Sequence, residues 1–359
     1  LRDFISLCHK YGMGVTFDVV FNHVYNVKSF NLANMLPYYF FRYKDGKLGN
    51  ASYCGNEVRT EAFFTREYLK LLVKRFIDIY DLDGYRFDLM GILDIETIEA
   101  IRDTARELKP DFLMYGEGWN MGDIVPYEYR AIKENAYKLD GVAFFNDDFR
   151  RTIRGNYIDD KNAYMLGYVD ARDRVKRVLS GSYEYGLNIN QTINYIECHD
   201  NYTVYDKVSR FFDDEKMVSR ICKLSMALVM ISRGIPFINS GEEFLRTKHG
   251  IDNTYNLDDS INMLDWHRKN NYLDVARYFS DLCLLRKTYK EFTREDTSVE
   301  FIDYYEVLIY KLGDLTIYIN PCIFDHVYND ESEHEVIFDD SGFVNYKRSV
   351  LKIKAFSIL

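Results

Sequence analysis

The feature that most constrains the fold of this chain is a repeated alternation of helical segments with short apolar strands. The first pair is a helix from about Leu1 to Cys8 and a β-rich run at 15–20, with glycines at 12 and 14 between them. Further helices are predicted at 61–80, 95–108 (with Asp94 as its N-cap), 131–137 and 217–232, and further strands at 84–89, 112–115, 142–145, 194–196 and 235–239. Six apolar strands separated mostly by helices indicate a parallel sheet.

This order fits either a doubly wound sheet or a (β/α)8 barrel. No GxGxxG follows any of the strands, which disfavours the dinucleotide-binding version of the doubly wound sheet. From about Lys290 the pattern changes to short alternating strands, expected at 305–312, 315–320, 335–338 and 349–356. The tail therefore predicts a separate small antiparallel β-domain.

Composition and charge exclude several classes of function. With 47% hydrophobic and 28% charged residues the chain is globular, not disordered or collagenous. Its net charge of −10 gives no general attraction to phosphate backbones or anionic lipid, so we expect neither a nucleic-acid nor a membrane partner. No apolar run approaches the roughly 20 residues that span a bilayer. Six scattered cysteines without a CxxC pair suggest core thiols and not a zinc or disulfide framework.

Polar side chains follow four of the predicted strands. They are Asp18, Asn22 and His23 in DVVFNH, Arg86 and Asp88 in GYRFDLMG, Glu117 and Trp119 in YGEGW, and His199, Asp200 and Asn201 in ECHDN. In a parallel barrel the active site forms at the carboxyl ends of the strands, so these clusters would converge on one pocket. One such cluster alone is more often a helix cap or a loop ion pair, and the inference depends on all four together.

Two of these carboxyl groups suit the cleavage of a glycosidic bond. A retaining mechanism needs two carboxyl groups about 5–5.5 Å apart, one ionised to attack and one protonated to release the leaving oxygen. Asp88 and Glu117 fit these roles. Arg86 precedes Asp88 by two residues on one strand, so both side chains point to the same face and the guanidinium can keep the carboxylate ionised.

Taken together, the four clusters resemble the four signature regions of the α-amylase superfamily, glycoside hydrolase family 13. Within that family the sequence is most similar to type I pullulanases, through CGNE at 54–57, GYRFDLMG, YGEGW, and GEEFLRTK followed by TYN and SINMLDW. The resemblance runs from residue 1 to about residue 290 and, less specifically, through the tail. It implies a catalytic (β/α)8 barrel at 1–290 and a C-terminal β-sandwich domain at 291–359.

The resemblance also implies roles for the clustered residues. Asp88 would be the nucleophile, Glu117 the general acid/base, and Asp200 the third catalytic carboxylate, which binds sugar hydroxyls. The implied substrate-binding residues are His23, Arg86, Trp119, His199 and Asn201, with Asp18 and Asn22 supporting them from behind. For Trp119 the alternatives are a packing aromatic and a stacking platform for a glucose ring.

The function implied is that of a retaining hydrolase that cleaves α-1,6-glucosidic bonds in pullulan, branched dextrins or glycogen. An α-1,4-acting amylase or neopullulanase, and a non-catalytic carbohydrate-binding homologue or inactive fragment, are the alternatives. Because Asp88, Glu117 and Asp200 are all present, an active ancestry is favoured. No cofactor is required. Calcium stays open: relatives bind it near the third strand, but no compact EF-hand-like loop occurs here.

The DVVFNH strand matches the third strand of the family's barrel. We therefore expect the first two strands, the first helix and the YNWGYDP motif of type I pullulanases to lie outside this chain. A barrel without two strands exposes two unpaired edges, so residues 1–359 alone are not expected to form a stable, active monomer. The sequence does not decide between a cytoplasmic and a secreted location.

Overall fold

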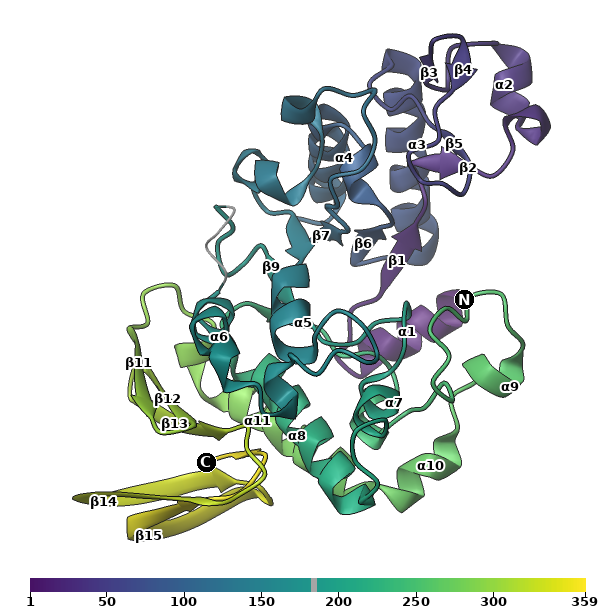
Figure 1. The fold of residues 1–359 in the computed structure, drawn as a ribbon. Coiled ribbons are helices and arrows are strands. Elements are labelled where there is room, and N and C mark those ends of the chain that lie inside the picture. The colour runs from purple at the N-terminus through teal and green to yellow at the C-terminus, as the bar shows by residue number, and fades with distance from the viewer. Residues whose placement is uncertain (182–185) are drawn as a thin grey trace. The chain divides into compact units, whose positions relative to one another are not determined.

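The structure is a computed structural model that describes residues 1–181 and 186–359, and it divides into two compact units (Figure 1). Unit 1 consists of Leu1–Phe145 and residues 186–191, and unit 2 of residues 146–181 and Thr192–Leu359. Each unit has its own hydrophobic core.

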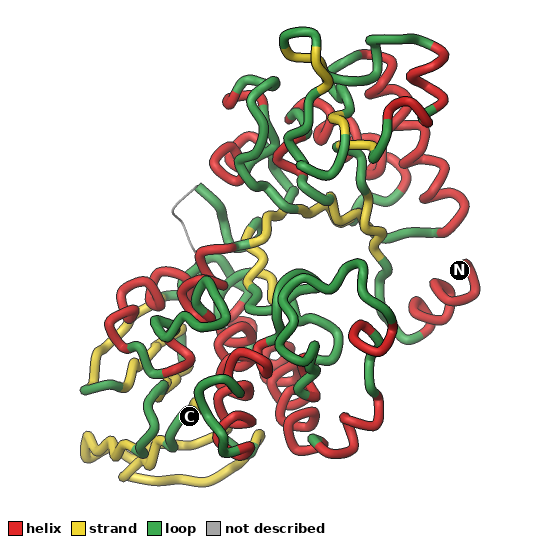
Figure 2. Tube along the Cα trace, turned by 45° about the vertical axis from the view of Figure 1, so that its right-hand side comes forward, coloured by secondary structure: helices red, strands yellow, loops and turns green. Residues whose placement is uncertain are grey.

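Unit 1 is built from helix–strand pairs in the predicted order. The pairs are α1 (Arg2–Lys10) with β1 (Thr16–Val19), α3 (Phe63–Tyr80) with β6 (Gly84–Phe87), α4 (Ile95–Leu108) with β7 (Leu113–Gly116), and the 3-10 helix η4 (Lys133–Lys138) with β8 (Ala143–Phe145). The four strands pair in the order β1-β6-β7-β8, and all are parallel. In Figure 2 these short strands run beside helices and long loops. The α-helix expected at 131–137 is instead of the 3-10 type.

Local sequence explains these elements. Asp94 caps α4 as predicted, because its carboxylate accepts a hydrogen bond from the backbone N–H of Thr97 at 2.9 Å. Helix α3 buries Leu69, Val73 and Ile77, which are spaced four residues apart and so share one face. All four residues of β6 are buried, as expected for a strand covered on both faces.

Short elements that the sequence did not predict lie between β1 and α3. They are β2 (His23–Val24) paired with β5 (Asn56–Glu57), β3 (Tyr43–Lys44) paired with β4 (Lys47–Leu48), the 3-10 helix η1 (Val27–Ser29) and α2 (Asn31–Met35). Elements of two to five residues give no hydrophobic period to detect. A further 3-10 turn, η2 (Met90–Ile92), follows β6.

Unit 2 packs helices around the strongly apolar α8 (Glu215–Ile231), predicted at 217–232. The other α-helices among the described residues of this unit are α5 (Asp147–Arg154), α6 (Arg172–Leu179), α7 (Val204–Val208), α9 (Asp259–Asn262), α10 (Trp266–Asn271) and α11 (Leu273–Thr288), and 3-10 helices occur at η5 (Tyr164–Leu166), η6 (Val169–Ala171), η8 (Glu242–Phe244) and η9 (Lys290–Phe292). Strands β9 (Thr192–Asn194) and β10 (Ile235–Pro236) are parallel. The strand expected at 194–196 lies two residues earlier, because the buried Tyr195 and Ile196 follow the paired residues.

The tail of unit 2 is antiparallel, as predicted. Strands β11 (Val299–Tyr304), β12 (Val307–Leu312), β13 (Leu315–Asn320) and β16 (Ser357–Ile358) form one sheet in that order, and β14 (His326–Asp339) pairs with β15 (Gly342–Ile353) in a long hairpin (Figure 1). The strands expected at 335–338 and 349–356 overlap β14 and β15, whose exposed halves carry no apolar pattern. Strand β11 was not predicted.

Two further features concern membrane-spanning helices and the cysteines. Within the described residues no helix is both long and apolar enough to cross a bilayer. All six cysteines are free, and Cys54 is exposed, contrary to the expectation that these thiols lie in the core.

Candidate active site

The register of the parallel sheet in unit 1 brings three of the predicted clusters together. Asp18 on β1 lies opposite Arg86 on β6, and Phe87 lies opposite Gly116 on β7. Asp88 and Glu117 therefore come directly after the paired ends of neighbouring strands. Their backbone N–H groups continue the ladder, donating to the carbonyls of Val19 and Phe87, each at 3.1 Å. Parallel pairing thus gathers these side chains at one edge.

Arg86 is the centre of this cluster. Its Nη1 lies 2.7 Å from Oδ1 of Asp18 and 3.3 Å from Oδ1 of Asp88, and its Nη2 lies 2.5 Å from Oε1 of Glu117. The Arg86 side chain is only 9% exposed. Burial lowers the pKa of Arg86, but the charges of Glu117, Asp18 and Asp88 outweigh it and raise the pKa above its ordinary value. One permanent cation therefore serves three carboxylates.

Backbone groups fix Glu117 from its other side. The N–H of Leu89, a residue in the left-handed region at φ 39°, donates to Oε2 of Glu117 at 3.0 Å. The N–H of Gly91 donates to the carbonyl of Glu117, also at 3.0 Å. A Cβ at Gly91 would come within 1.9 Å of the Trp119 carbonyl oxygen, so only glycine fits there. The turn after β6 therefore holds both Glu117 and the start of the loop that follows it.

Asn22 and His23 also lie at this cluster. The buried Asn22 amide donates to Asp88 twice, to the backbone carbonyl at 2.6 Å and to Oδ2 at 3.2 Å, and Oδ1 of Asn22 lies 2.5 Å from Nδ1 of His23. His23 is half-buried on β2. Asn22 therefore contacts Asp88 directly, a closer position than the supporting one expected from the sequence. Trp119 is half-buried as well, with the Lys133 ammonium 5.7 Å from its ring.

The polar side chains near the motif where calcium was left open already contact one another. The Asn22 amide is fully engaged by Asp88 and His23, and the nearby carboxylates already face Arg86. Calcium binds through six to eight oxygen ligands. Across residues 1–181 and 186–359 no group of three or more His, Cys, Asp or Glu side chains could hold a metal ion.

The fourth cluster lies in unit 2. The side chains of His199 and Asp200 are 61% and 54% exposed, with His199 Nε2 3.5 Å from Asp200 Oδ1. Asn201, at φ 63°, accepts a hydrogen bond from Arg150 Nη1 at 3.0 Å. The buried Lys248 donates from Nζ to the backbone carbonyls of His199 at 2.9 Å and Asn201 at 2.7 Å. Lys248 thus holds the backbone on both sides of Asp200.

Two buried carboxyl groups lie in the same unit. Glu197, three residues before Asp200, accepts hydrogen bonds from the Asn239 amide at 2.9 Å and the Val204 N–H at 2.7 Å. Glu242 accepts one from the Asn239 N–H at 3.1 Å. Burial raises the pKa of both, and the charge of Glu197 raises that of Glu242 further.

Sequence reasoning missed the residues that hold these clusters. Lys248 occurs in the GEEFLRTK motif, which by itself indicates no role for this residue. Arg150 lies in none of the motifs. Arg150 lies within α5, and Lys248 follows the 3-10 helix Glu242–Phe244. A basic residue at such a position is by itself only a weak signal of a functional role. Their function as donors to one loop depends on contacts across 47 or more residues of sequence.

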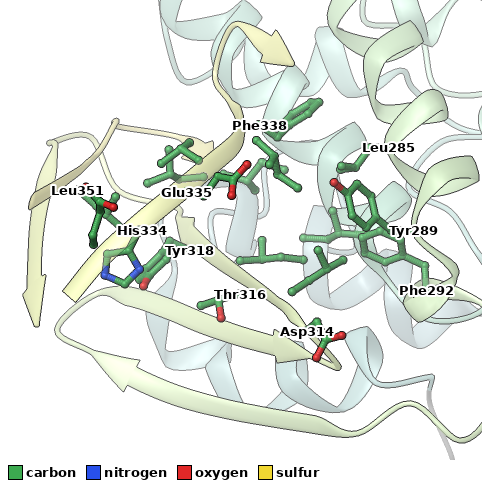
Figure 3. A pocket seen from close by; sticks show the side chains of 18 residues that line it. Leu285, Tyr289, Phe292, Asp314, Thr316, Tyr318, His334, Glu335, Phe338 and Leu351 are labelled. Atoms are coloured by element: carbon green, nitrogen blue, oxygen red, sulfur yellow. The ribbon is translucent and has the colours of Figure 1, made fainter. Parts of the chain in front are cut away.

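Figure 3 shows a separate cavity of about 470 Å³ in the tail of unit 2. Its lining is mainly aliphatic and aromatic, with Leu285, Tyr289 and Phe292 on one side and Phe338 on another. It contains none of the predicted site residues. The cavity therefore has no part in the chemistry suggested by the carboxylates.

Comparisons with known proteins agree with the motifs. No family model matches the chain. A pullulanase of Bacillus subtilis (strain 168) is 36% identical over 332 residues, which cover 88% of this chain and 46% of that protein. Pullulanase A of Streptococcus pneumoniae is 32% identical over 267 residues, covering 71% of this chain and 21% of that protein. The chain spans less than half the length of these relatives.

Solved structures show the same likeness. The type I pullulanase of Bacillus subtilis complexed with maltose superposes with a TM-score of 0.94 at 30% identity, covering all of this chain and 55% of the other. A pullulanase of Anoxybacillus complexed with maltotetraose gives the same score, identity and coverage. The resemblance inferred from the motifs is confirmed.

Proposed function

Because this chain is type I pullulanase-like, we propose that it carries the catalytic carboxylates of a retaining glycoside hydrolase. This enzyme debranches α-glucans at α-1,6-glucosidic bonds. The single observation that carries the proposal is the Arg86 cluster, in which one buried guanidinium contacts both Asp88 and Glu117. Two carboxyl groups that flank one bond are what glycoside hydrolysis requires.

The parallel strands of the two units, in this proposal, belong to one (β/α)8 barrel at 1–290, followed by a β-sandwich domain at 291–359. The four parallel strands of unit 1, the parallel pair β9-β10 and the antiparallel tail support this division. The site then lies at the carboxyl ends of the strands, where barrel enzymes place their catalytic groups.

The carboxylates divide the reaction between them. Asp88 attacks the anomeric carbon while Glu117 gives its proton to the leaving oxygen, which forms a covalent glycosyl-enzyme intermediate. Glu117, now ionised, then takes a proton from the water that releases the sugar from Asp88. Arg86 orients both groups and keeps Asp88 ionised for the attack, and Asn22 fixes the side chain of Asp88 through its amide.

The remaining predicted residues bind the substrate. Asp200 serves as the third carboxylate on the sugar hydroxyls, with His23, His199 and Asn201 as hydrogen-bonding partners and Trp119 as a stacking surface. The substrate is an α-glucan such as pullulan or a branched dextrin, and relatives bind maltose and maltotetraose. The proposed chemistry requires no cofactor.

The test compares full chains on two substrates. In a longer protein that carries residues 1–359 together with two further barrel strands, reducing ends are expected to be released from pullulan faster than from amylose, and Asp88→Asn and Glu117→Gln are each expected to lose nearly all turnover on pullulan. Asp103→Asn, an exposed carboxylate on α4, is the matched control and should keep full activity. An activated fluoro-sugar should label Asp88.

The alternatives give different outcomes. Faster cleavage of amylose would assign an α-1,4 specificity. Binding of maltotetraose without any turnover would indicate a non-catalytic carbohydrate-binding protein. A label on a residue other than Asp88 would contradict its role as nucleophile, and equal loss by Glu117→Gln on good and poor leaving groups would contradict its role as the acid.

A further inference from the structure

Unit 1 contains a hollow of its own, separate from the cavity in the tail of unit 2. It is connected to the carboxylate cluster and has no role in the reaction above. Its volume is about 660 Å³, within the range of roughly 300–1,000 Å³ that is usual for sites of small ligands. It is lined by the β3–β4 hairpin, the loop at 49–53 with Glu57, and residues 122–124. We propose that this hollow is an additional binding site for glucosyl units of an α-glucan chain, with Tyr53 as its stacking residue. This inference rests on the proposed function.

Two connections join the hollow to the carboxylates. Glu57 at its base pairs with His23 in the β2–β5 ladder, and His23 contacts Asn22 beside Asp88. On the other side, the loop after β7 runs from Glu117 to Asp123. Arg130 holds this loop by donating to the side chain of Asn120 and to the carbonyls at 121 and 122, at 2.6–3.2 Å. The hollow and the carboxylates therefore share their supporting elements.

The base of the hollow is fixed in shape. Glu57 is buried and accepts hydrogen bonds from the Ala51 N–H at 2.9 Å and from Arg42 at 3.2 Å. Gly122 has a φ of 79°, and a Cβ on it would come within 2.9 Å of the Ala51 Cβ. The two loops therefore touch where only glycine fits, and the site does not have to form anew when a ligand binds.

Tyr53 has an unusual backbone for an aromatic residue. Its φ is 58°, in the left-handed region that costs a non-glycine residue energy, and its side chain is 85% exposed at the rim. The N–H of Tyr53 donates to the Asn50 carbonyl at 3.2 Å, and that of Cys54 to Ser52 Oγ at 3.2 Å. An exposed aromatic ring kept on a strained turn brings no packing benefit to the fold. Strain of this kind is often retained for binding.

The charges of the lining favour a neutral, hydroxyl-rich ligand. Lys44 forms an ion pair with Asp123, and Glu57 is neutralised by Arg42. Asp45 and Lys47 add one charge of each sign. An anionic ligand would meet no excess of positive charge, and an apolar ligand would bury these charged groups at a cost. Sugars combine apolar ring faces, which suit Tyr53, with hydroxyls that suit such polar groups.

The experiment measures maltotetraose and pullulan binding by calorimetry to the same longer protein that carries residues 1–359, in an Asp88→Asn background that prevents hydrolysis. Tyr53→Ala should weaken maltotetraose binding about five- to tenfold, the loss expected when one aromatic contact is removed. Tyr305→Ala is the matched control, since Tyr305 is also exposed and left-handed, at φ 52°, but lies in the tail of unit 2. It should leave binding unchanged.

Tyr53→Gly separates a binding role from a structural one. Glycine relieves the left-handed strain, so this variant should melt at or above the temperature of the parent and still bind maltotetraose as weakly as Tyr53→Ala. Unchanged binding in both Tyr53 variants would overturn the inference, as would a parent that binds neither glycan. If the chain with Asp88 intact does not cleave pullulan but binding still depends on Tyr53, the proposed function fails and the site stands.

Discussion

Asp88 and Glu117 in unit 1 lie against one buried guanidinium, whereas Asp200 in unit 2 lies on an exposed loop that Lys248 holds only through backbone carbonyls. The difference extends to buried charge. In unit 1, Arg86 faces every carboxylate of the cluster. In unit 2, Glu197 and Glu242 are buried mainly against amide donors, and the pKa of each is raised.

This contrast teaches that the two regions fix their carboxyl groups for different purposes. In the proposed mechanism Asp88 must be ionised and exact in position when it attacks, and direct pairing with Arg86 serves both needs. A side chain that contacts neutral hydroxyls needs only a correctly placed backbone. The predictions below test whether the two arrangements differ as strongly as their contacts suggest.

The largest effect is expected for Arg86→Met. Three carboxylates would lose their shared cation, so the free energy of unfolding should fall by about 3–5 kcal/mol and pullulan hydrolysis should fall by about 10³-fold or more. Arg86→Lys keeps the charge but cannot reach both Asp88 and Glu117, so it should recover stability more than activity. Urea unfolding and initial rates measure the two effects. Arg102→Met is the control, because Arg102 lies on α4, with its side chain 15% exposed, and pairs with Asp103 outside the cluster; equal losses in both variants would contradict the role of Arg86.

A smaller effect, confined to activity, is expected for Lys248→Met. Without its two hydrogen bonds the loop around Asp200 should shift, and kcat/KM on pullulan should fall about 10²-fold. Lys207→Met is the matched control, because Lys207 is equally buried and also donates to a backbone carbonyl, that of Tyr157, at 2.6 Å. Lys248→Arg should restore part of the activity. If Lys207→Met and Lys248→Met lose stability and activity in the same proportion, Lys248 does not act through Asp200.

The smallest effect concerns stability and its pH dependence in unit 2. The pKa of Glu242 is raised in the fold, so the folded state binds more protons than the unfolded state above the ordinary pKa of a glutamate. Its contribution to stability is therefore greatest at acidic pH and declines as the pH rises towards neutral. Glu242→Gln removes the charge, and at pH 7 it should raise the free energy of unfolding by about 1 kcal/mol and flatten its decline with pH.

Thermal melts from pH 5 to 8 test this prediction. The control is Glu243→Gln, since Glu243 is only half-buried and accepts a hydrogen bond from the Gly241 N–H at 2.9 Å. A Glu242→Gln variant that melts below the parent at neutral pH would mean that the ionised carboxylate is needed in the fold.

Local sequence determined much of this protein. Apolar periodicity located the helices at 61–80, 95–108 and 217–232 to within two residues, because each buries one face or its whole surface. Asp94 was recognisable as a cap because capping depends on neighbouring backbone groups. The motifs after the strands identified the family and the residues of the Arg86 cluster.

Tertiary structure decided what local patterns do not encode. No local pattern indicates that Asn22 contacts Asp88, that Lys248 supports the loop of Asp200, or that Tyr53 adopts a left-handed backbone beside a hollow. Each depends on residues that are distant in sequence or on a turn whose conformation other loops impose. Burial raises the pKa of Glu242, and the parallel register brings Arg86 to Glu117. Both exist only after the chain has packed. Patterns within one segment specify its helices and strands, but the side chains that come into contact depend on how the whole chain packs.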